Sequence, residues 1–134
     1  MKIDGACHCG AIAYEAEIDP ANVGICHCTD CQTLSGTAFR TTVYTPEADF
    51  KLLSGQPKTY VKTAASGNKR AQAFCPDCGS PIYATSVGPG PKVLGLRVGA
   101  IRQRDALPPR KQYWVRSAQA WLGNVGFLPN AGRP

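Results

Sequence analysis

The chain has 134 residues, a length that suits one domain with a modest hydrophobic core. It holds 14 glycines and 11 prolines against 18% charged residues, which favours short strands and many turns over long helices. The formal charge is +6 at pH 7, but no run of five or more basic residues occurs, so a nucleic-acid partner is not indicated.

The N-terminus and the apolar stretches carry no signal for export or membrane insertion. Residues 1–10 (MKIDGACHCG) contain no apolar run behind a basic start, so we expect no secretory signal peptide. The longest mostly apolar stretch, 93–101, is interrupted by Arg97 and is too short to span a bilayer. We therefore expect a cytoplasmic protein with no membrane partner, whose cysteines bind metal or act in catalysis rather than form disulfides.

Short strands separated by turn residues are the predicted elements of most of the chain. Residues 11–18 alternate apolar side chains with small or charged ones, which is typical of a half-buried strand. Further strands are predicted, in chain order, at 22–26, 38–44, 59–63, 70–74, 81–85, 93–98 and 112–116. The pattern predicts a mainly β fold with more than one small sheet, in a single domain over residues 1–134.

A short helix is predicted directly after the second strand, over residues 29–34. Thr29 is an acceptable N-cap residue, and Asp30 suits the first turn, where the helix dipole favours negative charge. Gly36 is a plausible C-terminal stop, because glycine readily adopts the left-handed conformation that ends helices.

The C-terminal region is predicted to contain a second short helix and then a tail. The helix is expected over 117–122, with Gly123 ending it. Residues 124–134 have little to pack against and are expected to lie extended on the surface, attached to it by Phe127 and Leu128.

Seven cysteines in three tight groups are the feature that points to a function. Thiolates at short spacings match the tetrahedral preference of zinc. Seven ligands divide into four, which would close a structural site, and three, which would leave one coordination position for water or substrate. The groups are Cys7 and Cys9; Cys26, Cys28 and Cys31; and Cys75 and Cys78.

The first and last groups are predicted to share a structural zinc ion. The sequence Cys75-Pro-Asp-Cys78-Gly is typical of a zinc knuckle, in which Gly79 takes the positive φ of a tight turn. Cys7 and Cys9 would supply the other two thiolates, because residues i and i+2 of an extended chain face the same side. A zinc ion held by these four residues would connect the N-terminus to the middle of the chain.

The middle group is predicted to form an open, catalytic zinc site. Cys26 and Cys28 share one face at the end of a predicted strand. Cys31 comes from the first turn of the following helix and returns toward them. No fourth cysteine is left over, so the fourth position of a tetrahedral ion stays available.

Two other interpretations of the middle group stay open at this stage. In one, it forms a second structural site with a nearby side chain as the fourth ligand; the candidates are His27, His8 and Asp30. In the other, the thiols are reactive without a metal. Each histidine stands between the cysteines of a C-x-C, where an extended chain points the middle side chain away from the metal, so packing is the commoner role.

The cysteine groups and their surroundings occur in the order of a known family. The stretches are 5–10 (GACHCG), 26–32 (CHCTDCQ), 35–39 (SGTAF), 74–82 (FCPDCGSPI), 113–117 (YWVRS) and 120–122 (AWL). In these the chain resembles the glutathione-dependent formaldehyde-activating family, also called the centromere protein V-like family. The resemblance implies several coiled antiparallel sheets, a structural zinc on Cys7, Cys9, Cys75 and Cys78, and a catalytic zinc on Cys26, Cys28 and Cys31.

The resemblance also implies an activity, with two zinc ions per chain. The enzyme would be a carbon–sulfur lyase that joins glutathione to formaldehyde as S-hydroxymethylglutathione. At an open zinc site a substrate thiol is deprotonated and can attack a carbonyl carbon. Glutathione carries two carboxylates, and Arg40 on the next strand is the candidate to orient it; the plainer alternative is a solvated surface arginine.

Two rival functions start from the same cysteines. One is a binding module in which two structural zinc sites hold a surface for a partner, with a filled fourth position and no small-molecule cleft. The other is a related zinc carbon–sulfur lyase that acts on a different thiol adduct. The number of ligands at the middle group separates the first rival from an enzyme.

Overall fold

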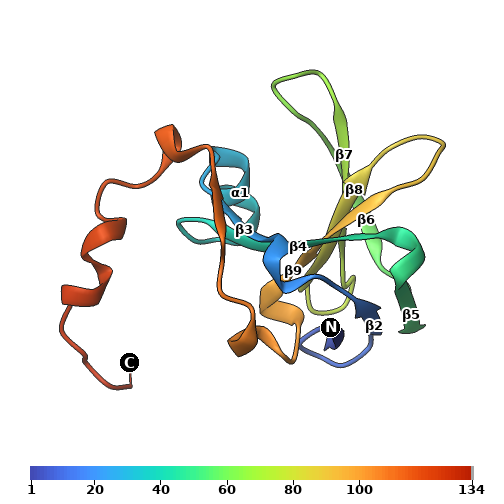
Figure 1. Ribbon diagram of the computed structural model, residues 1–134, viewed down its shortest axis with the longest axis horizontal. Helices are drawn as coiled ribbons and strands as arrows, with labels where there is room; N and C mark the ends of the chain where they lie inside the picture. The colour runs from blue at the N-terminus through green and yellow to red at the C-terminus, as the bar shows by residue number, and fades with distance from the viewer. Residues whose placement is uncertain (134) are drawn as a thin grey trace.

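Figure 1 shows the computed structural model, which describes residues 1–133. The chain folds mainly as β-strands arranged in two sheets, with one short α-helix and several 3-10 turns. The fold class predicted from apolar alternation and turn signals is confirmed. The parallel pairing of β10 with β3 is the one exception to antiparallel order among the described strands.

The smaller sheet joins the N-terminal hairpin to a strand from further along the chain. Its order is β1-β2-β5, and both pairs are antiparallel. The strands are β1 (Lys2–Ala6), β2 (Ala13–Glu17) and β5 (Phe50–Ser54). The sequence pattern predicted β2 but missed β1 and β5.

The larger sheet has the order β10-β3-β4-β9-β8-β7-β6. Its strands are β3 (Val23–Cys26), β4 (Arg40–Pro46), β6 (Lys58–Thr63), β7 (Lys69–Phe74), β8 (Pro81–Ser86), β9 (Val93–Arg97) and β10 (Lys111–Tyr113). All seven were predicted, with ends that differ by a few residues. The predicted strand at 112–116 stops early because Trp114 has a positive φ of 57°, which takes the backbone out of the extended region.

The hydrophobic core lies between the two sheets. Its largest fully buried side chains include Tyr14 and Ile3 from the smaller sheet and Ile82 and Leu96 from the larger one. Three aromatic rings connect the sheets: the ring centroids of Tyr14 and Phe50 are 5.0 Å apart, and those of Phe50 and Tyr83 are 5.4 Å apart. Such contacts position the two sheets relative to each other.

Helix α1 (Thr29–Ser35) lies between β3 and β4, as predicted. Its N-cap is Cys28 rather than Thr29, because the Cys28 sulfur accepts a hydrogen bond from the Cys31 N–H at 3.3 Å. The predicted stop is confirmed: Gly36 adopts φ 72°, and its N–H donates to the Gln32 carbonyl.

The C-terminal region differs from its prediction. In place of one helix at 117–122, two 3-10 helices form, η5 (Val115–Ser117) and η6 (Leu122–Phe127). Four more 3-10 turns connect the strands: η1 (Pro20–Asn22), η2 (Glu47–Asp49), η3 (Val98–Ala100) and η4 (Arg104–Ala106).

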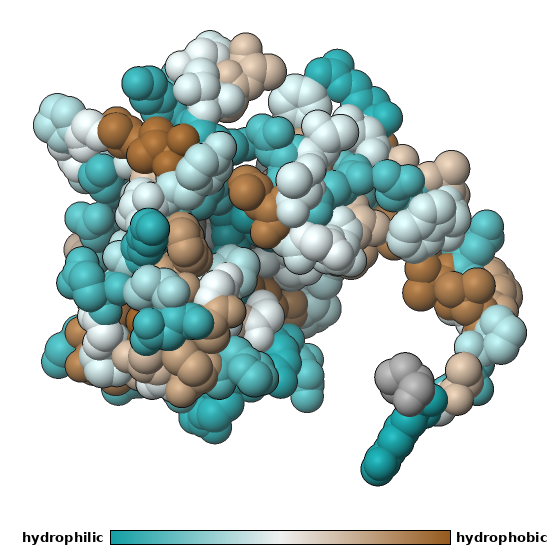
Figure 2. All heavy atoms as spheres, turned by 180° about the vertical axis from the view of Figure 1, so that it is seen from behind, coloured by the Kyte–Doolittle hydropathy of each residue, from teal (hydrophilic) through white to brown (hydrophobic). Residues whose placement is uncertain are grey.

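The residues from η6 to Arg133 form an arm that projects from the body (Figures 1 and 2). Phe127 is 87% exposed and Leu128 is 65% exposed, so neither attaches the arm to the surface as the sequence suggested. Within residues 1–133, no helix has the length and apolar character needed to cross a membrane.

Candidate metal centres and the clefts beside them

The four-cysteine cluster lies where the two sheets meet. Cys7 follows β1 of the smaller sheet, and Cys75 and Cys78 lie in the turn between β7 and β8 of the larger one. The sulfur atoms of Cys7, Cys9, Cys75 and Cys78 all lie within 4.8 Å of one another. Cys7 and Cys75 are buried, while Cys9 and Cys78 are exposed.

Two tight turns bring these sulfur atoms together. In the first, Gly10 at φ 82° donates its N–H to the Cys7 carbonyl at 3.1 Å. In the second, Gly79 at φ 77° donates to the Cys75 carbonyl at 2.8 Å, which agrees with the predicted knuckle. The sequence predicted that Cys7 and Cys9 meet through extended chain. In the structure a turn brings their sulfur atoms together instead.

The spacing of the sulfur atoms fits a tetrahedral zinc ion. The Cys7–Cys9 and Cys9–Cys75 sulfur distances are 3.6 Å and 3.8 Å. A tetrahedron with zinc–sulfur bonds of about 2.3 Å has edges of about 3.8 Å. A disulfide needs sulfur atoms about 2.05 Å apart, so these cysteines are not paired covalently. The Cys7 sulfur also accepts the Ile12 N–H at 3.2 Å, which stabilises a thiolate.

The three-cysteine cluster lies at the junction of β3 and α1. Cys26 is the last residue of β3, Cys28 caps the helix, and Cys31 lies in its first turn. Their sulfur atoms also lie within 4.8 Å of one another, and all three residues are partly buried. A local change from strand to helix over six residues is what makes the three side chains converge.

None of the three side chains considered as a fourth ligand joins this cluster. His27 is 1% exposed, and its Nε2 lies 2.9 Å from Gln112 Oε1, while its ring packs against Phe39. Asp30 forms an ion pair with Lys62 at 2.9 Å. His8 is exposed beside the other cluster. Among residues 1–133 the group therefore offers three ligand atoms, all of them sulfur.

Arg40 connects the three-cysteine cluster to a buried polar network. Its Nη2 donates to the Cys31 sulfur at 3.4 Å, and its Nη1 donates to Gln72 Oε1 at 3.5 Å. Arg97 donates to the same Gln72 oxygen at 2.8 Å and to Thr42 Oγ1 at 3.0 Å. Arg40 is only 7% exposed, so the alternative of a solvated surface arginine is wrong.

The register of the larger sheet places these residues on one face. Cys26 pairs with Arg40, and Thr42 pairs with Arg97. Gln72 pairs with Ala84, which in turn pairs with Gly95. Since Ala84 and Gly95 are small, the Arg97 and Gln72 side chains meet above them.

The electrostatics of the face favour negative charge near Cys31. Burial raises the pKa of the Cys31 thiol, but the hydrogen bond and charge of Arg40 outweigh it and lower that pKa overall. Burial and the neighbouring thiols Cys28 and Cys31 raise the pKa of Cys26 to about 12. Three adjacent sulfurs repel one another when ionised, and a divalent cation among them would remove that repulsion.

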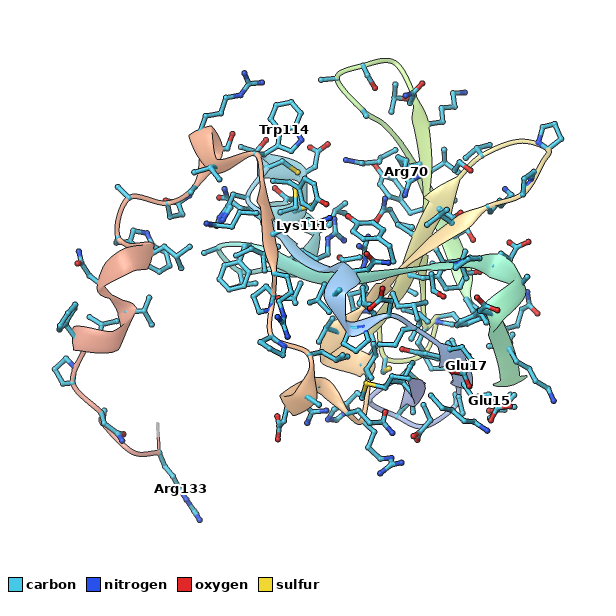
Figure 3. All side chains as sticks on the ribbon, viewed as in Figure 1. Glu15, Glu17, Arg70, Lys111, Trp114 and Arg133 are labelled. Atoms are coloured by element: carbon cyan, nitrogen blue, oxygen red, sulfur yellow. The ribbon has the colours of Figure 1, made fainter. Side chains whose placement is uncertain are left out.

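Arg97 keeps its charge in this setting. Burial and then the positive charge of Arg40 lower its pKa to about 10, with a smaller effect from Arg70. Arg70 extends from β7 on the side that faces α1 (Figure 3). Glu15 and Glu17 lie on β2, away from this face (Figure 3). The guanidinium groups therefore give the site a positive field at neutral pH.

A cleft of about 750 Å³ lies between the two clusters. Ser80 and His8 line it near the four-cysteine cluster, and Ser35 and Phe39 line it near the other. Its arginines are Arg40, Arg97, Arg102 and Arg104. Arg102 is paired with Asp4 at 2.7 Å, whereas the other three form no ion pair with a carboxylate in residues 1–133.

A second cleft, of about 430 Å³, adjoins the first. Arg40, Pro81 and Arg97 line both clefts and so form the wall between them. We refer to the first as the arginine cleft and to the second as the apolar cleft. Arg40, which contacts the Cys31 sulfur, therefore borders both spaces.

Sequence reasoning missed Arg97 and Gln72. A signal was present, because Arg97 is a charged residue inside an apolar strand, and Gln72 stands between two alanines in another. Neither signal says which strands are neighbours. Only the sheet order brings both side chains to Arg40.

Comparisons with known proteins agree with this geometry. The sequence model of the family described as "Glutathione-dependent formaldehyde-activating enzyme" matches residues 2–117. A crystal structure of a Rhodobacter sphaeroides protein is similar in fold, with a TM-score of 0.61 and 20% sequence identity over 81% of this chain and 98% of that chain. A search of curated proteins found no significant match. The structural similarity, at this identity, concerns the fold alone.

Proposed function

Because this chain belongs to the glutathione-dependent formaldehyde-activating family, we propose that it is a zinc-dependent carbon–sulfur lyase. In this proposal Cys26, Cys28 and Cys31 hold a catalytic zinc ion. A second, structural zinc ion is held by the other four cysteines, Cys7, Cys9, Cys75 and Cys78. The reaction joins a thiol such as glutathione to formaldehyde or a related aldehyde.

One observation carries the proposal: the two clusters differ in ligand number and in surroundings. The four-cysteine cluster supplies a complete tetrahedral set of sulfur ligands. The other supplies three, and its Cys31 contacts Arg40, which lines both clefts. Three protein ligands beside a cleft are typical of catalytic zinc, whereas four are typical of structural zinc.

The chemistry forms one bond and moves one proton. The sulfur of the thiol bonds to the carbonyl carbon, the π electrons of the C=O bond move to its oxygen, and that oxygen takes up the proton released from the thiol. A zinc ion, when bound, supplies the positive charge that makes the thiol acidic near neutral pH. Arg40 donates hydrogen bonds at this place and favours the negative charge that develops on sulfur or oxygen.

The arginine cleft supports glutathione as the thiol. Glutathione has two carboxylates and one ammonium group at neutral pH, and so carries net negative charge. Arg40, Arg97 and Arg104 line the cleft without a carboxylate partner in residues 1–133. Guanidinium groups bind carboxylates through paired hydrogen bonds.

Cobalt substitution tests whether a thiol takes the fourth position. We expect glutathione to intensify the thiolate-to-cobalt charge-transfer bands of the protein loaded with Co²⁺, because a fourth sulfur joins three. S-methylglutathione has the same charges but no free thiol, and should leave those bands unchanged. If the two compounds have the same effect, or neither perturbs the metal, a binding module with two structural sites becomes the better interpretation.

A further inference from the structure

The apolar cleft is not needed for formaldehyde. Leu34, Tyr60 and Phe74 are among the residues that line it. Its volume of about 430 Å³ is more than ten times the roughly 30 Å³ that one water molecule occupies in the liquid. Formaldehyde has two heavy atoms and would leave nearly all of this space unfilled.

An ion pair connects α1 and β6 beside the apolar cleft. Asp30 of α1 and Lys62 of β6 form an ion pair at 2.9 Å. Tyr60 lies two residues before Lys62 on the same strand, and so projects on the same face. Tyr60 also pairs with Gln72, which contacts Arg40. The ion pair therefore links the strand that carries Tyr60 to the helix that carries Cys31.

The cleft reaches the place where the reaction would occur. Leu34 follows Cys31 by three residues on α1, so the two side chains lie on neighbouring parts of one helix face. Arg40 lines the cleft and donates to the Cys31 sulfur at 3.4 Å.

We propose that the apolar cleft receives an apolar, ring-sized substituent on the carbonyl substrate, so that this enzyme acts on an aromatic or comparably bulky aldehyde. This inference rests on the proposed function, with glutathione in the arginine cleft. The carbonyl carbon lies at the wall that Arg40 and Arg97 form between the clefts. The new carbon–sulfur bond forms there, and the carbonyl oxygen takes up the thiol proton, as in the reaction above.

Two stable thioethers test the proposal by binding alone. Each thioether is an adduct of glutathione with an aldehyde from which the hydroxyl group is missing. S-benzylglutathione corresponds to the benzaldehyde adduct, and S-methylglutathione corresponds to the formaldehyde adduct. Isothermal titration calorimetry on the zinc-loaded full chain gives both affinities. We expect the benzyl compound to bind at least about tenfold more tightly, because burial of a ring in an apolar cleft is favourable.

Two variants on β6 test whether the preference for the benzyl compound arises in the apolar cleft. Tyr60→Ala removes one wall of the cleft, and should reduce the preference for the benzyl compound to about threefold or less. Val61→Ala is the matched control, because Val61 is 47% exposed on the opposite face of the same strand and does not line the cleft. It should retain the full preference.

The outcomes separate this inference from the function on which it rests. If glutathione and S-methylglutathione bind but the benzyl group adds nothing, or if Tyr60→Ala keeps the preference, the apolar cleft has another role and this inference fails alone. If no glutathione compound binds at all, glutathione is not the thiol and both proposals fail. A preference that Tyr60→Ala abolishes and Val61→Ala keeps supports the inference.

Discussion

Arg40 lies between the three-cysteine cluster, a buried polar network and the two clefts. It donates to the Cys31 sulfur and to Gln72, and Arg97 donates to the same Gln72 oxygen. The guanidinium group has five donors in a fixed plane, whereas the lysine ammonium is a compact charge on a flexible chain. Charge alone would therefore not replace Arg40.

We expect Arg40→Lys to lower kcat/KM for adduct formation by about 10-fold to 100-fold. A hydrogen bond to a charged group contributes about 1.5–3 kcal/mol, and lysine cannot reproduce the simultaneous contacts to Cys31 and Gln72. The measurement is steady-state kinetics together with zinc content, which should stay at two ions per chain. Arg110→Lys is the control, because Arg110 is exposed and lies outside both clefts. Equal activity of the two variants would show that Arg40 takes no part in the reaction.

For individual residues, the sequence predicted those features that depend on local spacing along the chain. The grouping of cysteines and the positive φ of Gly79 follow from a few consecutive residues. The buried state of Arg40 and its link to Arg97 depend on which strands are neighbours in the sheet. A single sequence does not report strand order, and so these contacts could not be predicted.

Helix α1 is only seven residues long, yet it carries Cys31, Leu34 and the Asp30 side of the ion pair to β6. A helix of this length is marginal by itself, so its ends and its contacts decide whether it forms. Cys28 caps one end through its sulfur, and Gly36 ends the other in the left-handed conformation.

Gly36→Ala should destabilise the protein by about 1 kcal/mol. No atom lies within 4 Å of the place where the added Cβ would stand, so the cost comes from the φ of 72° and not from a clash. Thermal unfolding should show a melting temperature lower by about 3–5 °C for a domain of this size. Gly123→Ala is the control. The added Cβ again meets nothing within 4 Å, and Gly123 does not have a positive φ, so the variant should melt close to the wild-type temperature.

The elements that were missed lack the patterns on which strand prediction depends. In β1 the second inward position is Gly5, where a Cβ would stand 2.4 Å from the Tyr14 ring, so Ile3 alone marks the inward face and no apolar alternation appears. In β5 most side chains are exposed, and no alternation appears. The wrongly predicted helix at 117–122 had end signals but no apolar face to bury, and this stretch has few buried residues.

For the whole molecule, the four-cysteine cluster acts as the junction between the sheets. Cys7 follows the first strand of the smaller sheet, and Cys75 follows β7 of the larger one. Both are buried in the core, beside the aromatic contacts of Tyr14, Phe50 and Tyr83. The three-cysteine cluster joins only β3 to the helix that follows it. Loss of metal from the two clusters should therefore have different consequences.

We expect a chelator to remove the two zinc ions in separate steps. The first ion should leave the three-cysteine cluster, which has an exchangeable fourth position, and the fold should persist by circular dichroism. The second should leave the four-cysteine cluster together with unfolding, because structural zinc contributes on the order of 10 kcal/mol to folding. Cys31→Ala should accordingly give a folded chain with one zinc ion, whereas Cys78→Ala should give insoluble or molten protein. Simultaneous loss of both ions, or equal loss of folding in the two variants, would mean that both clusters are structural.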